Sequence, residues 1–299
     1  MARNLRGTRG YRLSGARMLI TGGGSGLGRL MALEAARRGA EVIVWDLSAQ
    51  AGEATVEQVR AAGGAARSAV VDVTDREAVY RAAGQAGAVD VVVNNAGVVS
   101  GARLLEIPDA AIERTMDVNV LALYWVTKAF LGGMIERGHG SVVTIASAAG
   151  LVGVARQTDY SASKWAAVGF IESLRNELRA DGHPINTLAV CPFYIDTGMF
   201  AGVQTRFPRL LPILDPDEVT TRVIEAIEDG RQHLVMPALV GALPALRVLP
   251  TRLFDRVMDV LGVNRSMDGF TGRDASVAAG GQPPAKGGST STRESGLTG

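Results

Sequence analysis

The chain has 299 residues, and 47% of them are apolar, which is enough to bury one substantial core. The formal net charge of +1 gives no general reason to expect a nucleic acid or an acidic partner. The single cysteine, Cys191, excludes an internal disulfide and a thiolate cluster for a metal, so we expect no metal site. No apolar stretch follows the arginines of the first 17 residues, which predicts a cytoplasmic protein without a leader.

Composition divides the chain into four parts. Residues 1–15 are rich in arginine and are expected to form a basic, mobile arm. Residues 16–236 form a single predicted domain, and residues 237–274 form a helical extension. From 275 to 299 glycine, serine, threonine and proline dominate, which predicts a disordered tail.

Predicted strands and helices alternate through the domain. Apolar runs predict strands at 18–21, 41–45, 68–73, 89–94, 141–147, 185–191 and 233–236. Helical spacing predicts helices at 27–36, 48–62, 76–85, 109–137, 160–180 and 216–229. Strands that are apolar without alternation are buried on both faces, as in a parallel sheet covered by helices. We therefore predict an α/β fold, a doubly wound (Rossmann) parallel sheet of about seven strands, with ligands at the carboxyl ends of the strands.

A glycine-rich turn joins the first predicted strand to the first predicted helix. It reads Thr21-Gly-Gly-Gly-Ser-Gly-Leu-Gly28, and such glycines let a pyrophosphate approach the helix N-terminus closely. Asp46 ends the next predicted strand, where a carboxylate accepts hydrogen bonds from the adenosine ribose and repels the 2′-phosphate of NADP. The combination predicts a dinucleotide site that prefers NAD.

Tyr160 and Lys164 lie four residues apart on a predicted helix, so they share a face. A free tyrosine has a pKa of about 10 and is a poor base at neutral pH unless positive charge stabilises its phenolate. We expect the Lys164 ammonium to lower the pKa of Tyr160, and Ser147 to hold the substrate oxygen. Tyr160 is then the general base in oxidation and the general acid in reduction.

These motifs, together with Asp72-Val73, Asn94-Asn-Ala-Gly97 and Asn119, resemble the short-chain dehydrogenase/reductase family from about residue 16 to 233. The resemblance implies a catalytic tetrad of Asn119, Ser147, Tyr160 and Lys164, with Asn119 positioning a water in a proton relay. It also implies that Lys164 binds the nicotinamide ribose and that Asp72 and Val73 hold the adenine. The expected cofactor-binding residues are Thr21, Gly22, Ser25, Gly26, Leu27, Gly28, Asp46, Asp72, Val73, Asn95, Ala96, Gly97, Tyr160, Lys164, Pro192, Ile195 and Thr197.

The chain departs from the family after the sixth strand, where Phe193 replaces a common glycine and leaves the path of the loop open. The segments 44–46, 94–99, 119–122, 127–130, 144–150 and 166–170 look like the branch that holds retinol dehydrogenases and 17β-hydroxysteroid dehydrogenases of the lipid-droplet type. That branch implies a lipophilic alcohol, and apolar residues at 151–154 and 200–214 agree with a pocket and a lid. A redox-sensing binding protein and a lyase or epimerase are the alternatives on the same fold.

The extension after residue 236 contains three prolines and lacks the 20 or so uninterrupted apolar residues that a spanning helix needs. Packing on the domain or on a second subunit, covering the substrate entrance and lying against a bilayer all fit its composition. The family resemblance implies a homodimer or homotetramer built through the helices that carry Asn119 and Tyr160.

Overall fold

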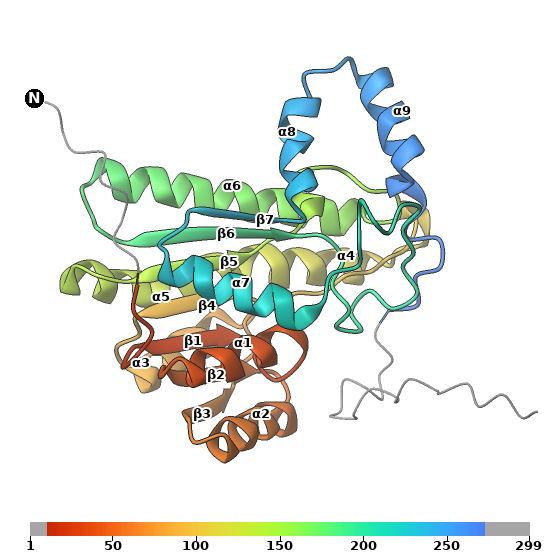
Figure 1. Cartoon of the computed structure of the whole chain (residues 1–299). Coiled ribbons are helices and arrows are strands. Elements are labelled where there is room, and N and C mark those ends of the chain that lie inside the picture. The colour runs from red at the N-terminus through yellow and green to blue at the C-terminus, as the bar shows by residue number, and fades with distance from the viewer. Residues whose placement is uncertain (1–10, 273–299) are drawn as a thin grey trace, which may run out of the picture.

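The computed structural model describes residues 11–272, and a single seven-stranded parallel sheet forms their centre (Figure 1). The strand order is β3-β2-β1-β4-β5-β6-β7, which confirms the predicted doubly wound fold. The strands are β1 (Arg17–Thr21), β2 (Glu41–Asp46), β3 (Ala65–Val70), β4 (Val91–Asn94), β5 (Ser141–Ile145), β6 (Asn186–Pro192) and β7 (His233–Met236).

Helices cover both faces of the sheet, as the uninterrupted apolar strands require. The helices that pack into one apolar core are α1 (Gly26–Arg37), α2 (Ala49–Ala61) and α7 (Pro216–Glu228). The helices that pack into the core on the other face are α3 (Arg76–Ala86), α5 (Ala122–Arg137) and α6 (Thr158–Ala180). The order of strands reverses between β1 and β4, so the crevice above their carboxyl ends is the expected ligand site.

Strand β3 differs from its prediction by three residues. It spans Ala65–Val70 instead of 68–73, because the whole of β2 pairs with it in parallel register from Glu41–Ala65 to Asp46–Val70. Ala65 and Ala66 are too small to signal a strand, so pairing decides where the strand begins. The apolar residues 71–73 lie beyond its carboxyl end, at the edge where the ligand crevice opens.

The helix predicted at 109–137 is interrupted. It consists of α4 (Asp109–Met116), a π-helical turn (Asp117–Leu121) and α5, and Asn119 lies within the π turn. In the part of the chain that the structure describes, only this stretch is long and apolar enough to cross a membrane by length and composition. Core helices meet the same criterion, and α5 packs against β4 and α3 inside the domain.

Two ends of the chain bear on the domain prediction. Residues 11–15, expected as part of a mobile arm, pack on the domain, where Leu13 is completely buried and the Tyr11 amide donates to the Glu228 carbonyl. Leu13 supplies the apolar anchor that the arginine-rich composition obscured. Residues 1–10 and the predicted tail at 275–299 lie outside the described residues.

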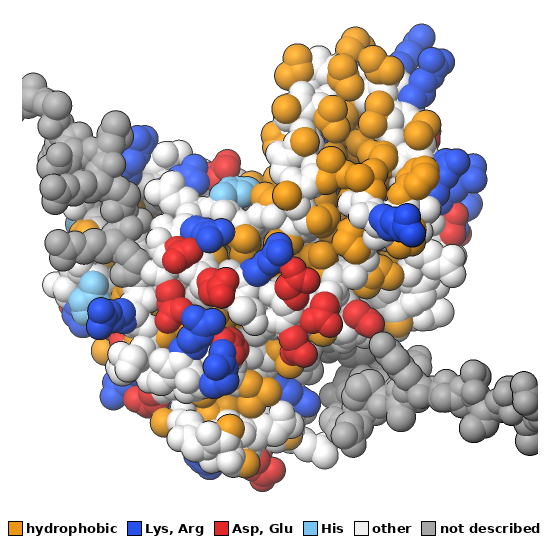
Figure 2. Space-filling model, in the orientation of Figure 1, with side chains coloured by type: hydrophobic (Ala, Val, Ile, Leu, Met, Phe, Trp, Pro, Cys, Tyr) orange, Lys and Arg blue, Asp and Glu red, His pale blue; other side chains and the backbone are white. Residues whose placement is uncertain are grey.

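The predicted extension forms a lobe that projects from the sheet beside α6 (Figure 1). It contains the 3₁₀ turn Ala238–Ala242, α8 (Leu243–Leu246), α9 (Thr251–Leu261) and the 3₁₀ turn Val263–Arg265. Figure 2 shows apolar side chains gathered over this lobe, with basic side chains at its outer edge. One face of α9 packs inward through Met258, whereas Leu253 and Val260 remain exposed.

Candidate active site

The glycine turn between β1 and α1 brings two backbone segments into close contact. Gly22 has a φ of +63°, and a Cβ there would lie 3.0 Å from the Cα of Ala96. A Cβ on Gly28 would meet the carbonyl of Gly22 and lie 2.6 Å from the Asn95 Nδ2. Only glycine fits at these two positions, so the chain forms a cradle that suits a pyrophosphate at the N-terminus of α1.

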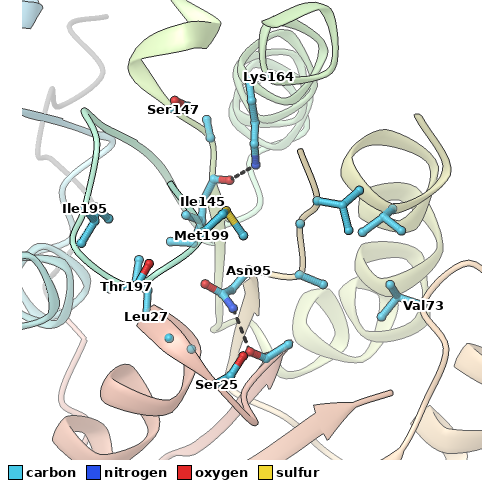
Figure 3. Close-up of a pocket in the computed structure, with 18 of the residues that line it drawn as sticks. Ser25, Leu27, Val73, Asn95, Ile145, Ser147, Lys164, Ile195, Thr197 and Met199 are labelled. Carbon is cyan, nitrogen blue, oxygen red and sulfur yellow. Dashed lines mark hydrogen bonds between the residues drawn. The ribbon is translucent and has the colours of Figure 1, made fainter. Parts of the chain in front are cut away.

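Thr21 and Asn95 join the ends of β1 and β4 beneath this cradle. The Thr21 hydroxyl accepts from the amides of Asn95 (3.0 Å) and Ala96 (3.1 Å). The Asn95 side chain donates to the carbonyls of Thr21 (2.9 Å) and Gly22 (3.2 Å) (Figure 3). Thr21 is buried and does not line the crevice, so its contribution is to fix the residues that do.

Asp46, at the end of β2, borders the same crevice. One carboxylate oxygen accepts from the Gly24 amide at 2.8 Å, and the other accepts from the Ser48 amide at 2.9 Å. A carboxylate has about four acceptor positions, so capacity remains toward the crevice. The nearby Arg29 guanidinium donates to the Gly24 carbonyl and to the Thr55 hydroxyl.

Nearly all the predicted site residues line one crevice, which extends from the glycine turn to Tyr160. The exceptions are Thr21 and Asn119, which are buried behind it. Figure 3 shows Ser25, Asn95 and Lys164 around the crevice. The predicted lid residue Phe200 also lines the crevice, and nine lining residues were not predicted: Leu47, Val71, Val98, Arg114, Val118, Ile145, Ala146, Phe193 and Met199. Most of them are apolar residues next to a motif, and periodicity could not separate them from core residues.

Tyr160 lies at the start of α6 and is buried. Burial raises the pKa of its phenol well above the ordinary value, and a hydrogen bond with the Ser147 side chain acts in the opposite direction. Ser147 follows β5 in the chain and caps a short 3₁₀ turn through its hydroxyl. The strand end and the helix start therefore bring the two hydroxyls together at the mouth of the crevice.

Lys164 lies one turn further along α6 and is also buried. Its Nζ donates to the Ile145 carbonyl at 2.8 Å and lies 5.6 Å from the centroid of the Tyr160 ring. Burial lowers the pKa of Lys164 to about 8. Nζ is thus held against the end of β5, and the predicted effect of Lys164 on the pKa of Tyr160 stays a prediction.

Asn119 connects three parts of the site. Its amide exchanges two hydrogen bonds with the Val98 backbone, both at 2.9 Å, and donates to the Ser163 hydroxyl at 3.0 Å. A Cβ on Gly97 would lie 3.4 Å from the Asn119 Oδ1 and 3.7 Å from the Lys164 Nζ. The side chain thus fixes the loop after β4 against α6, while the predicted water relay stays a prediction.

A buried carboxylate beside Tyr160 was not predicted. Asp159 accepts from the hydroxyls of Ser100 (2.7 Å) and Thr115 (2.8 Å), which come from the loop after β4 and from α4. These bonds hold the first turn of α6 in place. Acidic residues are common in the first turn of a helix because they interact favourably with the helix dipole. The sequence therefore carried no signal for this contact.

A second cavity adjoins the first and is almost entirely apolar. Both cavities are lined by Ser147 and Phe193. The predicted pocket and lid residues Val152, Val154, Leu210 and Leu211 contribute to its wall. The extension supplies the rest of the apolar wall through Leu239, Val240, Leu243, Leu246, Met258, Leu261 and Val263.

Phe193 continues the strand instead of turning away as a glycine would. Its amide donates to the Met236 carbonyl at 2.8 Å, which extends the pairing of β6 with β7 by one bond. The loop that follows closes on itself where Ile195 forms an isolated parallel bridge with Leu214, outside the strands of the sheet. Within this loop Phe200 packs on Tyr160, which places the predicted lid directly over the phenol.

Glycines that bring two backbones together at a switch point suit a dinucleotide, and a buried tyrosine beside a serine hydroxyl suits proton transfer at an alcohol oxygen. Fold and site define an oxidoreductase of the NAD(P)-dependent class that acts on alcohols. Residues 16–206 match the family model of short chain dehydrogenases. The chain belongs to this family.

Known relatives agree with this assignment. Epidermal retinol dehydrogenase 2 of Mus musculus is 44% identical over 268 residues, which cover 87% of each chain. A short-chain dehydrogenase/reductase from Burkholderia phymatum, solved with NAD, is 28% identical, with a TM-score of 0.72 over 80% of this chain and 94% of that one. A metagenomic short-chain oxidoreductase solved with NADP is also 28% identical, with a TM-score of 0.65 over 76% and 98%. The chain is therefore a short-chain oxidoreductase related to retinol dehydrogenases.

Proposed function

We propose that the protein interconverts a lipophilic alcohol and its carbonyl by hydride transfer with NAD(H), with Tyr160 as the acid/base. The junction of the two cavities carries this proposal. Ser147 and Phe193 line both the crevice that suits the dinucleotide and the apolar cavity. A molecule in the apolar cavity therefore presents its reacting carbon where the crevice begins.

Each residue of the site has one task in this proposal. Ser147 holds the substrate oxygen, and Tyr160 accepts its proton in oxidation and returns it in reduction. Lys164 and Asn119 hold the ribose side of the crevice and the start of α6, since both lie against Gly97. When bound, the nicotinamide accepts the hydride, and its positive charge in the oxidised form favours the phenolate.

The raised pKa of Tyr160 sets the direction of the pH dependence. The phenol is protonated at neutral pH within the protein alone, so it is ready to donate in reduction. In oxidation it must first lose its proton. We therefore expect kcat/KM for oxidation to increase with pH and that for reduction to decrease.

The cofactor preference follows from charge at the end of β2. Asp46 faces the crevice beside Leu47, and both line it. Arg29, the guanidinium beside the glycine turn, donates to the Gly24 carbonyl and the Thr55 hydroxyl. We infer that NAD(H) binds more tightly than NADP(H), because a 2′-phosphate beside Asp46 is repelled.

The substrate class follows from the second cavity. Its wall is built from aliphatic side chains of the 151–154 segment, the lid and the extension. Burial of apolar surface contributes about 25 cal/mol per Å², so a long or polycyclic alcohol is favoured strongly over a short one. The names of the relatives, retinol dehydrogenases, agree with a lipophilic alcohol of the retinoid, steroid or long-chain type.

Peripheral contact of a cytoplasmic protein with a membrane surface is part of the proposal. Val248 is 88% exposed at the outer end of the lobe, and Leu253 is exposed near Arg252 and Arg256. Apolar side chains beside basic ones suit the surface of an anionic bilayer. Co-sedimentation of the protein with vesicles of anionic lipid tests this contact. If a Val248→Glu, Leu253→Glu variant sedimented as well as the wild type, the lobe would be excluded as the membrane-binding surface.

The decisive test is a screen of lipophilic and short polar alcohols with NAD, read as NADH absorbance. We expect higher kcat/KM for steroids, retinol or long-chain alcohols than for short polar ones. Tyr160→Phe should keep NADH binding and lose turnover by about two to four orders of magnitude. Tyr80→Phe, on α3 and outside the lining of both cavities, is the control and should retain most of the activity. Near wild-type rates in Tyr160→Phe would refute the mechanism.

A further inference from the structure

The apolar cavity contains one polar group that the proposed reaction does not use. Gln157 lies just before α6, is 1% exposed and lines the cavity. Burying an amide costs free energy unless its donors and its acceptor find partners. The bonds made by Gln157 therefore show which of its atoms is left for a ligand.

A chain of hydrogen bonds fixes the direction of every donor behind Gln157. The Ser266 hydroxyl donates to the Val263 carbonyl at 2.7 Å, and a carbonyl can only accept. The single donor proton of the Ser266 hydroxyl is used in this bond. The Tyr194 hydroxyl therefore donates to the Ser266 oxygen, at 2.8 Å. Tyr194 in turn has only acceptor capacity left for Gln157.

The Gln157 amide must therefore present its NH₂ group to this chain. Nε2 lies 3.4 Å from the Tyr194 hydroxyl and 3.0 Å from the Met267 sulfur, so each N–H points at an acceptor. A flipped amide would place its oxygen against two groups with no proton to give. The Oε1 atom accepts no hydrogen bond from any residue between 11 and 272.

We infer that the apolar cavity binds a substrate with a second hydrogen-bond donor, a hydroxyl or N–H remote from the reacting carbon, which Gln157 Oε1 accepts. The inference rests on the proposed function, because it takes Ser147 and Tyr160 to hold the reacting oxygen. A ligand that ends in an ether or ketone would bring a second acceptor to Oε1. A purely aliphatic end would leave Oε1 unpaired in an apolar wall.

Matched alcohols test the donor requirement. The probes are a series of long-chain 1-alkanols, the corresponding α,ω-diols and the ω-methoxy alcohols, which carry an acceptor but no second donor. At the best chain length we expect the diol, corrected for its two equivalent ends, to exceed the other two in kcat/KM by roughly five- to tenfold. Equal values for diol and methoxy alcohol at every length would overturn the inference.

Three variants separate recognition by Gln157 from general damage to the cavity wall. Gln157→Met keeps the length of the side chain and removes the acceptor, so the preference for the diol should disappear while the 1-alkanol reacts at least as well. Tyr194→Phe removes the group that fixes the amide, so the methoxy alcohol should approach the diol. Leu210→Met, an apolar change elsewhere in the same wall, should leave the preference intact. A diol preference that survives in Gln157→Met would contradict the assignment.

Calorimetric titration of the same compounds needs no turnover. If no lipophilic alcohol is oxidised but the diol still binds more tightly than the methoxy alcohol in a Gln157-dependent manner, the proposed reaction fails and the donor requirement stands. If alcohols are oxidised without this difference, the reaction stands and the donor requirement fails. Absence of binding by all three compounds would remove the donor requirement as well.

Discussion

The ring of Phe200 lies edge-on against the ring of Tyr160, with their centroids 5.7 Å apart and their planes at 79°. Phe200 belongs to the loop after β6, whereas Tyr160 lies in the first turn of α6, so the contact joins the predicted lid to the proposed acid/base residue. It also contributes to the burial that raises the pKa of Tyr160. Lid position and proton affinity are therefore linked through one aromatic contact.

Replacing Phe200 by alanine should weaken both effects. We expect KM for a lipophilic alcohol to rise about tenfold, because an apolar wall of the reaction site is lost. Water then reaches Tyr160, its pKa falls, and the midpoint of the pH profile of kcat/KM for oxidation shifts to lower pH. Steady-state kinetics across pH measures both changes.

Phe207→Ala is the matched control for this variant. Phe207 is 39% exposed, stacks with Arg206 and borders neither cavity. Its removal should change neither KM nor the pH midpoint. If the two variants had the same KM and pH midpoint, the contact of Phe200 with Tyr160 would not be the source of these effects.

We expect the proposed preference for NAD(H) to weaken when the residue next to Asp46 is changed. Leu47 is 56% exposed and lines the crevice beside Asp46. We expect the wild type to bind NADH more tightly than NADPH, and Leu47→Arg to improve NADPH binding about tenfold by pairing the 2′-phosphate. Fluorescence titration of both reduced cofactors measures this.

Asp46→Asn removes the charge that would repel a 2′-phosphate and keeps part of the hydrogen bonding that supports the glycine turn. An asparagine oxygen can still accept from the Gly24 or Ser48 amide, so the glycine turn keeps part of its support. NADH binding should weaken slightly while NADPH binding improves. A wild type that prefers NADPH would refute the argument from Asp46.

Burial of the Lys164 ammonium lowers the free energy of unfolding, and a rise in pH removes this penalty. Its pKa falls from the ordinary 10.5 to about 8 in the folded protein. Between these values the unfolded chain binds more protons, so this residue makes the free energy of unfolding rise with pH across that window. Below pH 8 the penalty is fully present and amounts to about 3 kcal/mol.

Lys164→Met should therefore stabilise the protein and abolish turnover. Loss of the bond to the Ile145 carbonyl costs about 1 kcal/mol, so the net gain at neutral pH is about 2 kcal/mol. Denaturant unfolding of both proteins at several pH values gives the difference, which should shrink from pH 8 to 10.5. A difference that stays constant with pH would show that burial of the ammonium is not its source.

The sequence predicted the sheet, and nearly all the predicted site residues line one crevice, because their signals are local. The glycine turn, the strand end at Asp46 and the Tyr160–Lys164 spacing can each be recognised within a short stretch of the sequence. The start of β3 was missed because Ala65 and Ala66 become strand residues only through pairing with β2. The interruption at Asn119 likewise depends on contacts with Val98 and Ser163, far along the chain.

The substrate side was the harder part for the same reason. The extension had three compatible placements by composition, and the structure brings Leu243 and Met258 to the cavity wall through packing over long sequence separations. The network from Gln157 through Tyr194 to Ser266 spans more than a hundred residues. No local pattern marks such a bond, so these contacts with the cavity could not be predicted from the sequence.

The glycine turn allows a sharp test of the cradle. A Cβ at Gly28 would lie 2.6 Å from the Asn95 Nδ2 and against the Gly22 carbonyl, so Gly28→Ala must push the ends of β1 and β4 apart. We expect NADH affinity to fall by at least tenfold, measured by fluorescence titration, with a stability loss of about 1–3 kcal/mol. Gly84→Ala in α3 is the control, since nothing lies within 4 Å of its added Cβ. It should leave cofactor binding unchanged and stabilise the helix by up to about 1 kcal/mol.

Exposed apolar residues on α5 and its π turn favour assembly through the helices that flank the site. Leu121 and Tyr124 are both 42% exposed, and the Tyr124 ring meets Phe170 of α6 edge-on at 4.8 Å. Burying such a surface against a second copy would remove apolar area from water, so we expect a homodimer or homotetramer. Light scattering on the full chain should give a multiple of the 31.3 kDa chain mass.

A Leu121→Glu, Tyr124→Glu variant tests where the copies meet. Two buried charges without partners are costly at an interface, so this variant should shift the species toward the monomer. Tyr80→Glu changes an aromatic residue of similar exposure, 38%, on α3 and should leave the mass unchanged. A monomeric wild type would exclude this assembly, and an oligomer that resists the double change would place its interface on another face.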